Sequence, residues 1–301
     1  MAISEIAEKK WRLIIAAAAA LLLAACQTQK IETPGEASQA MYEGSLAFQE
    51  GDFSKAFRKL EPLAKSGNAE AQMLIGSMYY YGKGVNADYL KAFEWASKSA
   101  EQENAAAQFN IGAMYSQGAG VQQNDAEGLK WYHKAAAQGY VLAIHNIGWV
   151  YEKGLGVPVD YTEARNWYFK AAEMKFNISY MQLANLYSQG LGVEKNPEEA
   201  MKWFMKAANA NFLISGFFIA SMYENGEGVR KDFVEAYRWY LVAENGIEQL
   251  KEHPEFTLNS SSMYQLSTIA KRKRLLEQVM TPAEVAEAKR LASEWRPTSP
   301  W

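Results

Sequence analysis

Apolar residues recur along most of the chain at the spacing of one helical face. In the stretch 69–80 they stand at i, i+4, i+7 and i+8, which places them on one side of an α-helix. These residues are Ala71, Ile75, Met78 and Tyr79. Two glycines follow, and a second amphipathic stretch follows the glycines. The pattern predicts two helices joined by a glycine turn.

This pattern occurs five times with a constant period of 36 residues. The first glycines of the turns are Gly82, Gly118, Gly154, Gly190 and Gly226, and the second are Gly84, Gly120, Gly156, Gly192 and Gly228. The second stretches carry Trp95, Trp131, Trp167, Trp203 and Trp239. A tyrosine before the turn and a valine after it keep the same period. Five invariant columns indicate a repeat array, in which each helix pair needs neighbours to bury both of its faces.

Each invariant column has a predicted structural role. The first glycine should end the first helix in a left-handed cap, and the second should turn the chain back. The valine after it is expected to fill the space between the two helices. Small residues in the columns of Gly76 and Ala92 should let the helices approach closely. The tryptophans are expected to fill the groove between units, so that removing one would cost about 3–5 kcal/mol.

The second helix of each pair should begin at an asparagine or aspartate. Asn124, Asp160 and Asp232 each stand three residues before a glutamate, which resembles a capping box. Asn196 is followed by Pro197, which suits the first helical position.

The N-terminal segment has the composition of a secretory signal. Basic residues precede the 13 apolar residues 13–25, which are too few to span a bilayer about 30 Å thick. Leu23-Ala24-Ala25-Cys26 resembles the lipobox of bacterial lipoproteins. The resemblance implies a signal peptide over 1–25, lipidation of Cys26 and a tether over 26–37. Gln27 after the cysteine implies the outer membrane of the bacterial cell envelope, with the body facing the periplasm.

Composition excludes several other classes of protein. The net charge of −3 argues against a nucleic-acid binder. Cys26 is the only cysteine, so no disulfide framework is available. No spacing of histidines or acidic residues predicts a metal site, and no motif predicts a cofactor or catalytic residues. The basic run Lys271–Arg274 is interpreted as a solvated helix face, with contact to an acidic partner or anionic lipid as the alternative.

The copies share the pattern Ala-X3-Ile-Gly-X2-Tyr-X2-Gly-X-Gly-Val, followed by Lys/Glu-Ala-X2-Trp-Tyr. This pattern resembles the Sel-1-like repeat, a longer relative of the tetratricopeptide repeat. The resemblance implies an all-α fold, a right-handed α-solenoid of helix-turn-helix repeats. Five repeats are expected over 69–245. A degenerate tetratricopeptide-like repeat should cap the N-terminal side over 38–68. Capping helices are expected over 246–301, the last of them opened by a capping box at Thr281–Glu284.

By analogy with tetratricopeptide repeats, the first helices should line a concave face that binds a protein partner. The expected contact residues are Tyr80, Phe109, Asn110, His145, Asn146, Trp149, Gln182 and Asn185. Aromatic and amide side chains together are typical of protein-binding surfaces. The leading hypothesis is a membrane-anchored, non-catalytic scaffold. The alternative is a binder of peptidoglycan or other envelope glycans and peptides. A hydrolase is the third hypothesis, because some relatives of this family have been linked to β-lactam hydrolysis; those relatives carry cysteine pairs absent here.

Overall fold

The structure, a computed structural model, describes residues 36–249 and 260–298. The predicted signal peptide, Cys26 and most of the tether lie outside these ranges, as does His253. Within them, all regular secondary structure is α-helical. The chain divides into two compact units, Met1–Val159 and Asp160–Trp301. Each unit is described on its own.

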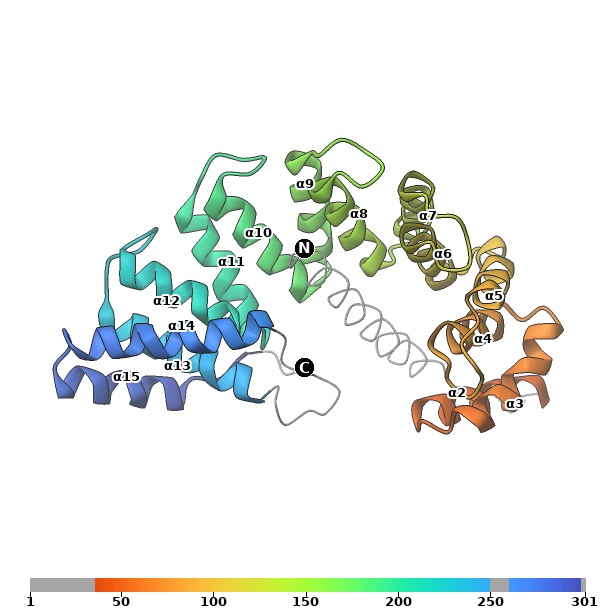
Figure 1. Ribbon diagram of the computed structural model, residues 1–301, viewed down its shortest axis with the longest axis horizontal. Helices are drawn as coiled ribbons and strands as arrows, with labels where there is room; N and C mark the ends of the chain where they lie inside the picture. Colours follow the sequence, from red (N-terminus) through yellow and green to blue (C-terminus); the bar gives the residue numbers. More distant parts are fainter. Residues whose placement is uncertain (1–35, 250–259, 299–301) are drawn as a thin grey trace. The chain divides into compact units, whose positions relative to one another are not determined.

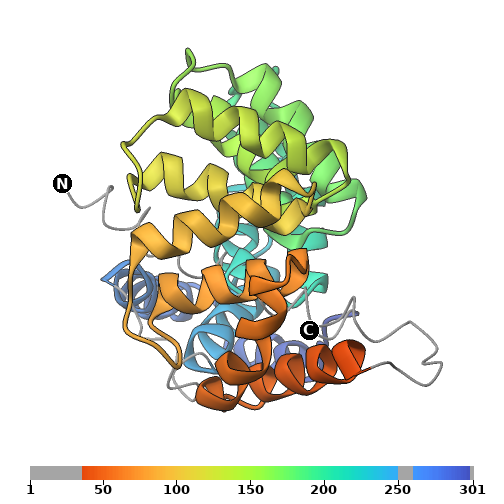
Figure 2. The ribbon, with the colours of Figure 1, turned by 90° about the vertical axis from the view of Figure 1, so that its right-hand side faces the viewer.

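The first unit is a stack of consecutive antiparallel helices (Figures 1 and 2). Its helices are α2 (Glu36–Gln49), α3 (Phe53–Lys65), α4 (Ala69–Tyr81), α5 (Tyr89–Glu101), α6 (Ala105–Gln117), α7 (Asp125–Ala137) and α8 (Val141–Lys153). From α2 to α8, each helix packs against the next one along the chain. The helix pair α2–α3 lies largely in the stretch 38–68, for which an N-terminal cap repeat was predicted.

The second unit continues the same alternation and ends in two further helices (Figure 1). Its helices are α9 (Tyr161–Glu173), α10 (Asn177–Gln189), α11 (Pro197–Asn209), α12 (Ser215–Asn225), α13 (Phe233–Gln249), α14 (Ser260–Glu277) and α15 (Pro282–Glu294). Helix α13 packs against α12, α14 and α15. The predicted all-α solenoid of helix-turn-helix repeats is confirmed.

Local sequence signals set the helix ends. Asn124 accepts a hydrogen bond from the Glu127 amide at 3.0 Å, and the corresponding residues Asp88, Asp160, Asn196 and Asp232 cap the other second helices. The predicted capping box of α15 is present, with Thr281 and Glu284 bonded reciprocally. The first glycine of every turn is a left-handed C-cap, with φ between 64° and 74°. These caps were predicted correctly because they depend on neighbouring residues alone.

The second glycine has a role beyond turning the chain. Gly120 has φ 72°, and a Cβ there would lie 2.0 Å from the carbonyl oxygen of Tyr89 in the preceding repeat. Across the five second glycines the nearest approach is 2.0–2.5 Å, always to backbone near the start of the preceding second helix. Each turn is therefore pressed onto the repeat before it, and only glycine permits that approach. This contact between repeats was not predicted.

The two helices of a pair cross where both carry small residues, as predicted. A Cβ on Gly112 of α6 would lie 3.0 Å from the Gly128 carbonyl oxygen of α7 and 2.7 Å from the Tyr132 ring. In the second unit Ala184, Ala200, Ala220 and Ala236 occupy these columns and are completely buried. The crossing therefore accepts a methyl group in some copies and none in others.

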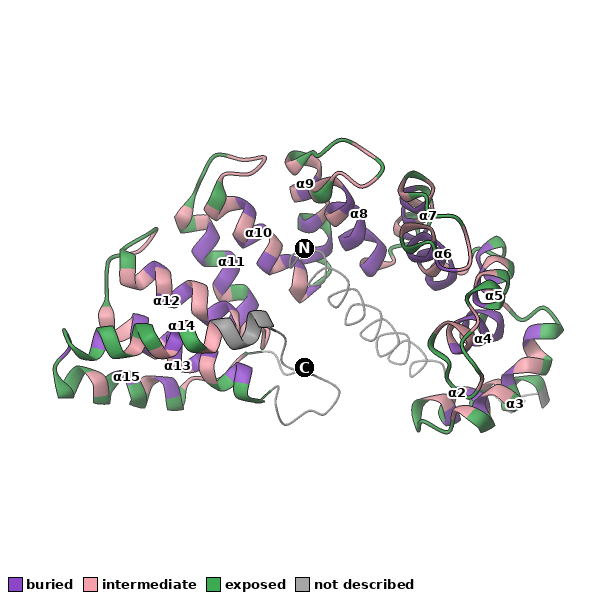
Figure 3. Ribbon diagram, in the orientation of Figure 1, coloured by how far each residue is buried: buried purple, intermediate pink, exposed green. Residues whose placement is uncertain are grey.

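The valine column differs from its predicted role, whereas Trp95 and Trp131 pack against clusters that include the preceding repeat, as predicted. The valines are half-buried, and Val85 packs against the cluster formed by α2, α3 and α4, so it serves the junction between repeats. Trp95, Trp131 and Trp167 are only half-buried, whereas Trp203 and Trp239 are buried. Buried, half-buried and exposed positions alternate along the helices of both units (Figure 3).

The position after the tryptophan is buried more deeply than the tryptophan itself in the first four copies. In successive copies these residues are Ala96, Tyr132, Tyr168, Phe204 and Tyr240, all at most 3% exposed. One helical step of about 100° separates the two columns, so the indole lies at the edge of the core. A lysine three residues on covers the indole in the first four copies, as with Lys134 at 3.7 Å from the Trp131 ring centroid.

The C-terminal helices close the array in the second unit. Helix α13 extends to Gln249, four residues past the predicted end of the repeats at 245. Trp295, the C-cap of α15, packs edge-to-face on Trp239 with ring centroids 5.3 Å apart. Lys273 of α14 pairs with Glu244 of α13 at 2.5 Å. The apolar face that α13 would offer to a further repeat is therefore covered by the chain itself.

Candidate functional site

Within each unit, the accessible side chains of the first helices form a face that changes from copy to copy. We call it the variable face and define it by three columns at i, i+3 and i+7, a spacing that lies along one side of a helix. The columns are Leu74, Asn110, Asn146, Gln182 and Phe218; Ser77, Ala113, Trp149, Asn185 and Ser221; and Tyr81, Gln117, Lys153, Gln189 and Asn225. All but Ala113 and Asn146 are half-buried or exposed.

Three predicted contact residues do not belong to an accessible face. Phe109 is completely buried, with its ring 5.6 Å from Tyr132 and 5.4 Å from Tyr140. His145 and Asn146 are each 1% exposed. Phe109 and His145 belong to the column of Met73, which packs against α5 and α6 in the core between repeats. The prediction placed that column on the accessible concave face, one helical step from its actual direction.

In the first unit, Tyr80, Asn110 and Trp149 are half-buried, on α4, α6 and α8 respectively. Tyr80 donates its hydroxyl hydrogen to Gln117 Oε1 at 2.5 Å, which joins the ends of α4 and α6. These predicted residues are accessible enough for contact with a partner. Trp149 and Tyr80 have the rigid amphipathic side chains that commonly anchor protein interfaces.

A tyrosine cluster at the α4–α5 turn was missed in the sequence. Tyr80 packs edge-to-face against Tyr81 at 4.9 Å and Tyr89 at 5.3 Å. Tyr81 is 41% exposed, Tyr89 51% and the adjacent Leu90 68%. Comparison of the copies could have found the cluster, because the 81 column holds only glutamine, lysine or asparagine in the other four repeats.

In the second unit, the predicted residues Gln182 and Asn185 are half-buried on α10. The next first helix, α12, offers Phe218 instead, and its ring stacks on Phe204 with centroids 5.0 Å apart. At the end of α12, Glu224 accepts a hydrogen bond from Tyr240 at 2.7 Å and pairs with Arg272 of α14 at 3.3 Å. Burial raises the pKa of Tyr240, and the contact with Glu224 raises it further.

The basic run on α14 is partly used for packing. Arg272 and Lys273 are paired with Glu224 and Glu244, whereas Lys271 and Arg274 are exposed. Two of the four cations therefore fasten α14 to α12 and α13, a role that neither interpretation of the sequence anticipated.

A buried polar group lies behind the variable face of the first unit. The hydroxyl of Tyr132 on α7 lies against Ser116 of α6 and Asn146 of α8. Burial raises the pKa of Tyr132, and the two neighbours lower it by a smaller amount. Asn146 thus contributes to the junction of three helices, which explains why it is unavailable to a partner.

No group of three or more histidine, cysteine or acidic side chains with the geometry of a metal site occurs in 36–249 and 260–298. None of the helices in those ranges is both long and apolar enough to cross a bilayer.

Comparison with known proteins identifies the repeat. The family model of the Sel1 repeat matches residues 69–104, 105–140, 141–176, 178–212 and 217–245, which together make up more than half of the chain. No curated protein matches.

Two solved structures are similar over most of the chain. One is c5321, a protective antigen present in uropathogenic Escherichia coli that displays an SLR fold: it is 32% identical with a TM-score of 0.69, and the match covers 86% of this chain. The chain spans only 54% of that antigen's length. The other is a Sel1 repeat protein from Oxalobacter formigenes, 30% identical with a TM-score of 0.66, covering 87% of this chain and 99% of that one.

Proteins built from Sel1 repeats are generally non-catalytic scaffolds for protein–protein interaction. The matched repeats coincide with the helix pairs α4–α5 to α12–α13, and their invariant positions are the glycine turns and tryptophans described above. The chain therefore belongs to the Sel1 repeat family.

Proposed function

We propose that the chain is a lipid-anchored scaffold, tethered through Cys26 to the outer membrane, that binds a protein partner in the periplasm through its variable face. The observation that carries the proposal is the contrast between constant and changing columns. Glycines, valines and tryptophans are identical in all five copies, while the variable face presents leucine, asparagine, glutamine, tryptophan or tyrosine at equivalent positions. A constant frame with a changing polar and aromatic surface suits specific recognition of one partner.

Burial supports the choice of surface. The second helices present lysine–glutamate pairs to solvent, such as Lys130–Glu127 at 2.7 Å and Lys202–Glu199 at 2.8 Å. Solvent-exposed pairs of this kind contribute little to affinity or stability. The variable face instead holds half-buried aromatic and amide side chains, and the aromatic ones lose little conformational entropy when a partner covers them, because they have only two side-chain torsions.

Site-specific photo-crosslinking in the native host tests this surface. A benzophenone amino acid at Gln117 or Gln189, both exposed on the variable face, is expected to give a discrete adduct with one protein. The same substitution at Gln122, an exposed glutamine in the α6–α7 turn, is the matched control. An identical adduct from Gln122, or none from all three sites, would refute the proposed surface. Trp149→Ala should then reduce the adduct formed at Gln117.

The membrane anchor has a separate test. Cys26→Ser should release the full chain from membranes into the periplasmic fraction, because stable anchoring needs acyl chains on that residue. Retention of the variant in the membrane pellet would disprove acylation as the anchor and leave the crosslinking result unaffected.

Peptidoglycan binding is the second candidate, favoured by the tyrosine cluster of Tyr80, Tyr81 and Tyr89. Exposed aromatic rings beside amides also suit glycan and peptide ligands. Co-sedimentation of the full chain with purified peptidoglycan, lost in Tyr81→Ala and Tyr89→Ala, would support this candidate in place of the protein partner.

A further inference from the structure

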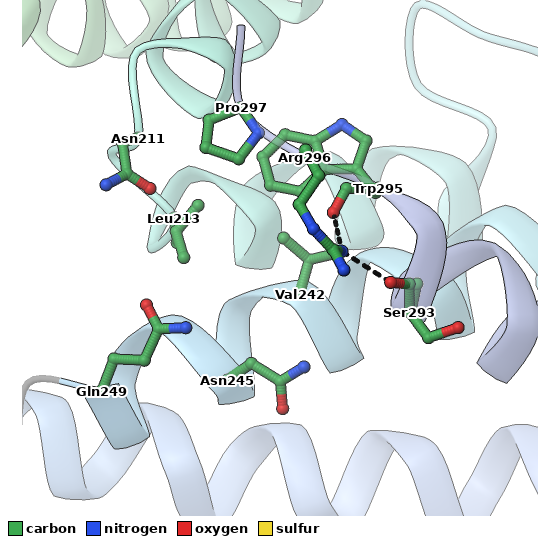
Figure 4. A pocket seen from close by; sticks show the side chains of 10 residues that line it. Asn211, Leu213, Val242, Asn245, Gln249, Ser293, Trp295, Arg296 and Pro297 are labelled. Carbon is green, nitrogen blue, oxygen red and sulfur yellow. Dashed lines mark hydrogen bonds between the residues drawn. The ribbon is translucent and has the colours of Figure 1, made fainter. Parts of the chain in front are cut away.

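A cavity of about 560 Å³ lies in the second unit, apart from the variable face (Figure 4). Its walls come from the α11–α12 loop, the last turns of α13, and the end of α15 with the residues that follow it. The volume is within the range of about 300–1,000 Å³ typical of ligand sites.

The cavity arises where the repeat period fails. The fifth first helix, α12, has 11 residues in place of 13, and its partner α13 has 17. The shortened start leaves Leu213 in the α11–α12 loop, where it lies directly against Gly246 of α13. A Cβ on Gly246 would be 2.2 Å from the Leu213 Cβ, so glycine is required for the loop to reach α13. No other copy has this arrangement. In the other four copies, the second helix packs against the first helix of the following repeat.

The inner part of the cavity is apolar. It is formed by Leu213, Val242, Ala292, Trp295 and Pro297 (Figure 4). Val242 and Ala292 are buried and the other three are half-buried. The Trp295 ring is held by its contact with Trp239, and its backbone N–H donates to the Leu291 carbonyl at 3.2 Å. The apolar lining is therefore fixed in position before any ligand arrives.

The rim is polar and carries a single charge. Asn211, Asn245 and Gln249 contribute amides, and Arg296 is the only ionised side chain among the described lining residues. Arg296 Nη1 donates to the carbonyl oxygens of Ser293 at 2.6 Å and Trp295 at 2.7 Å. These bonds offset the partial negative charge at the C-terminal end of α15, and they hold the guanidinium beside the cavity (Figure 4). Among the described residues nothing accepts a hydrogen bond from its Nη2 or Nε.

We propose that this cavity binds a short peptide that presents a carboxylate to Arg296 and an apolar side chain to the inner wall. A guanidinium pairs with a carboxylate through two parallel hydrogen bonds. Side-chain amides both donate and accept, so Asn211, Asn245 and Gln249 match the two polar groups of a peptide bond. No acidic residue is among the described residues that line the cavity, so this lining offers no counter-ion to a cationic ligand. This site is independent of the partner surface proposed above.

A matched pair of probes tests the charge requirement. Acetyl-Ala-Phe with a free carboxylate and acetyl-Ala-Phe-amide differ only in the group meant for Arg296. Titration of the full chain, followed by saturation-transfer NMR and calorimetry, is expected to show the acid binding at least tenfold tighter than the amide. Equal affinity for both probes, or no binding of either at about 10 mM, would overturn the proposal.

Variants locate the binding to this cavity. Arg296→Gln and Asn245→Asp should each weaken binding of the acid at least tenfold, the first by removing the cation and the second by placing a like charge opposite the ligand. The matched control is Arg290→Gln on α15, where the arginine pairs with Glu287 and Glu294 outside the cavity. It should leave the affinity unchanged.

Helical circular dichroism and thermal unfolding establish that each variant is folded. If Arg296→Gln and Arg290→Gln affect binding equally, or if Ala-Phe-amide with its free amine binds more tightly than the acid, the assignment is wrong.

Discussion

The helix pairs α6–α7 and α12–α13 share every invariant column, yet their tryptophans have different surroundings. Trp131 of α7 is half-buried at the edge of the core, under the ammonium group of Lys134. Trp239 of α13 is 1% exposed and is covered by Trp295 from outside the repeats. Identical positions in the repeat therefore differ in burial according to what packs on them. In a solenoid, each repeat contacts only the elements next to it. These neighbours therefore determine how much the side chain in a given column contributes to the free energy of unfolding.

The same two pairs differ at the helix crossing. In α6–α7, glycines meet at Gly112 and Gly128, and the Tyr132 ring fills the remaining space. In α12–α13, Ala220 and Ala236 occupy the crossing, and Tyr240 instead bonds to Glu224. The turn glycines are alike in both pairs. The comparison separates what every repeat needs, the turn, from what each repeat adjusts, the crossing and the outer face.

The largest effect is expected at the second glycine of the turn, in both pairs. Gly120→Ala combines positive φ with a Cβ placed 2.0 Å from backbone, and Gly228→Ala places one at 2.5 Å. Strain of about 1–3 kcal/mol and overpacking of similar size should lower the unfolding free energy by about 5 kcal/mol. The control, Gly118→Ala, has a similar φ of 68°, but its nearest contact is the Gln123 Cβ at 3.3 Å, so only the backbone strain of about 1–3 kcal/mol is expected. Urea unfolding followed by circular dichroism measures all three; equal losses at Gly118 and Gly120 would refute the contact between repeats.

Tryptophan replacement should separate the two pairs most clearly. Trp239→Ala removes a buried indole and its contact with Trp295, at a cost of about 4 kcal/mol. Trp131→Ala removes a half-buried indole and one cation–π contact, for which about 2 kcal/mol is expected. Chemical denaturation of both variants gives the difference. If Trp131→Ala lowers the free energy of unfolding as much as Trp239→Ala does, the neighbouring elements do not determine the contribution of this column.

Local features of the fold were predictable from the sequence. Helix ends followed from capping residues such as Asn124 and Thr281, and the left-handed cap followed from Gly118, because each depends on a few adjacent residues. The contact between Gly120 and Tyr89 was not predictable in this way. It joins residues 31 positions apart, and it exists only once the repeats have stacked.

The candidate site was harder to predict because it depends on the rotation of a helix. Phe109 and Asn110 are neighbours in sequence, yet one is buried against Tyr132 and Tyr140 and the other is half-buried on the variable face. Apolar residues of the first helices extend over more than half of the circumference, so the pattern alone did not fix the outward direction. The cavity at Arg296 had no sequence signal, because it forms where the repeat period is broken.

An intermediate effect is expected at the crossing. Gly112→Ala would place a methyl group 2.7 Å from the Tyr132 ring, and overpacking should cost about 2 kcal/mol. Gly112→Ala combined with Tyr132→Phe does not remove this clash, because the contacting atoms belong to the ring. Tyr132→Ala should relieve it, so the double variant Gly112→Ala/Tyr132→Ala should lose less than the sum of the two single losses. Additive losses in this double-mutant cycle would show that the ring does not explain the need for glycine.

The smallest effects are expected at the helix caps, where the two regions should agree. Thr281→Ala on α15 and Asn124→Ala on α7 each remove one side-chain acceptor from a helix N-terminus, with a loss of about 1 kcal/mol. Because a cap acts locally, its value should not depend on the neighbouring repeats. Thermal unfolding compares the two variants, and a difference of more than about 1 kcal/mol would show that α15 is coupled to the array more strongly than α7.

A pH series isolates the other half of the α15 cap. The Thr281 backbone N–H donates to Glu284 and lowers the pKa of this carboxyl below its ordinary value of 4.5. A group whose pKa is lower in the folded state stabilises it above the unfolded pKa and loses that contribution as the pH falls through the folded value. The wild-type chain should therefore exceed Glu284→Gln in melting temperature at pH 7, with the difference shrinking as the pH falls below 4.5 and disappearing once it is below the folded pKa. The Asn124 cap has a neutral acceptor, so the deficit of Asn124→Ala should stay constant over the same range. A deficit in Asn124→Ala that also disappears on acidification would assign the pH dependence to the array as a whole and not to the cap of α15.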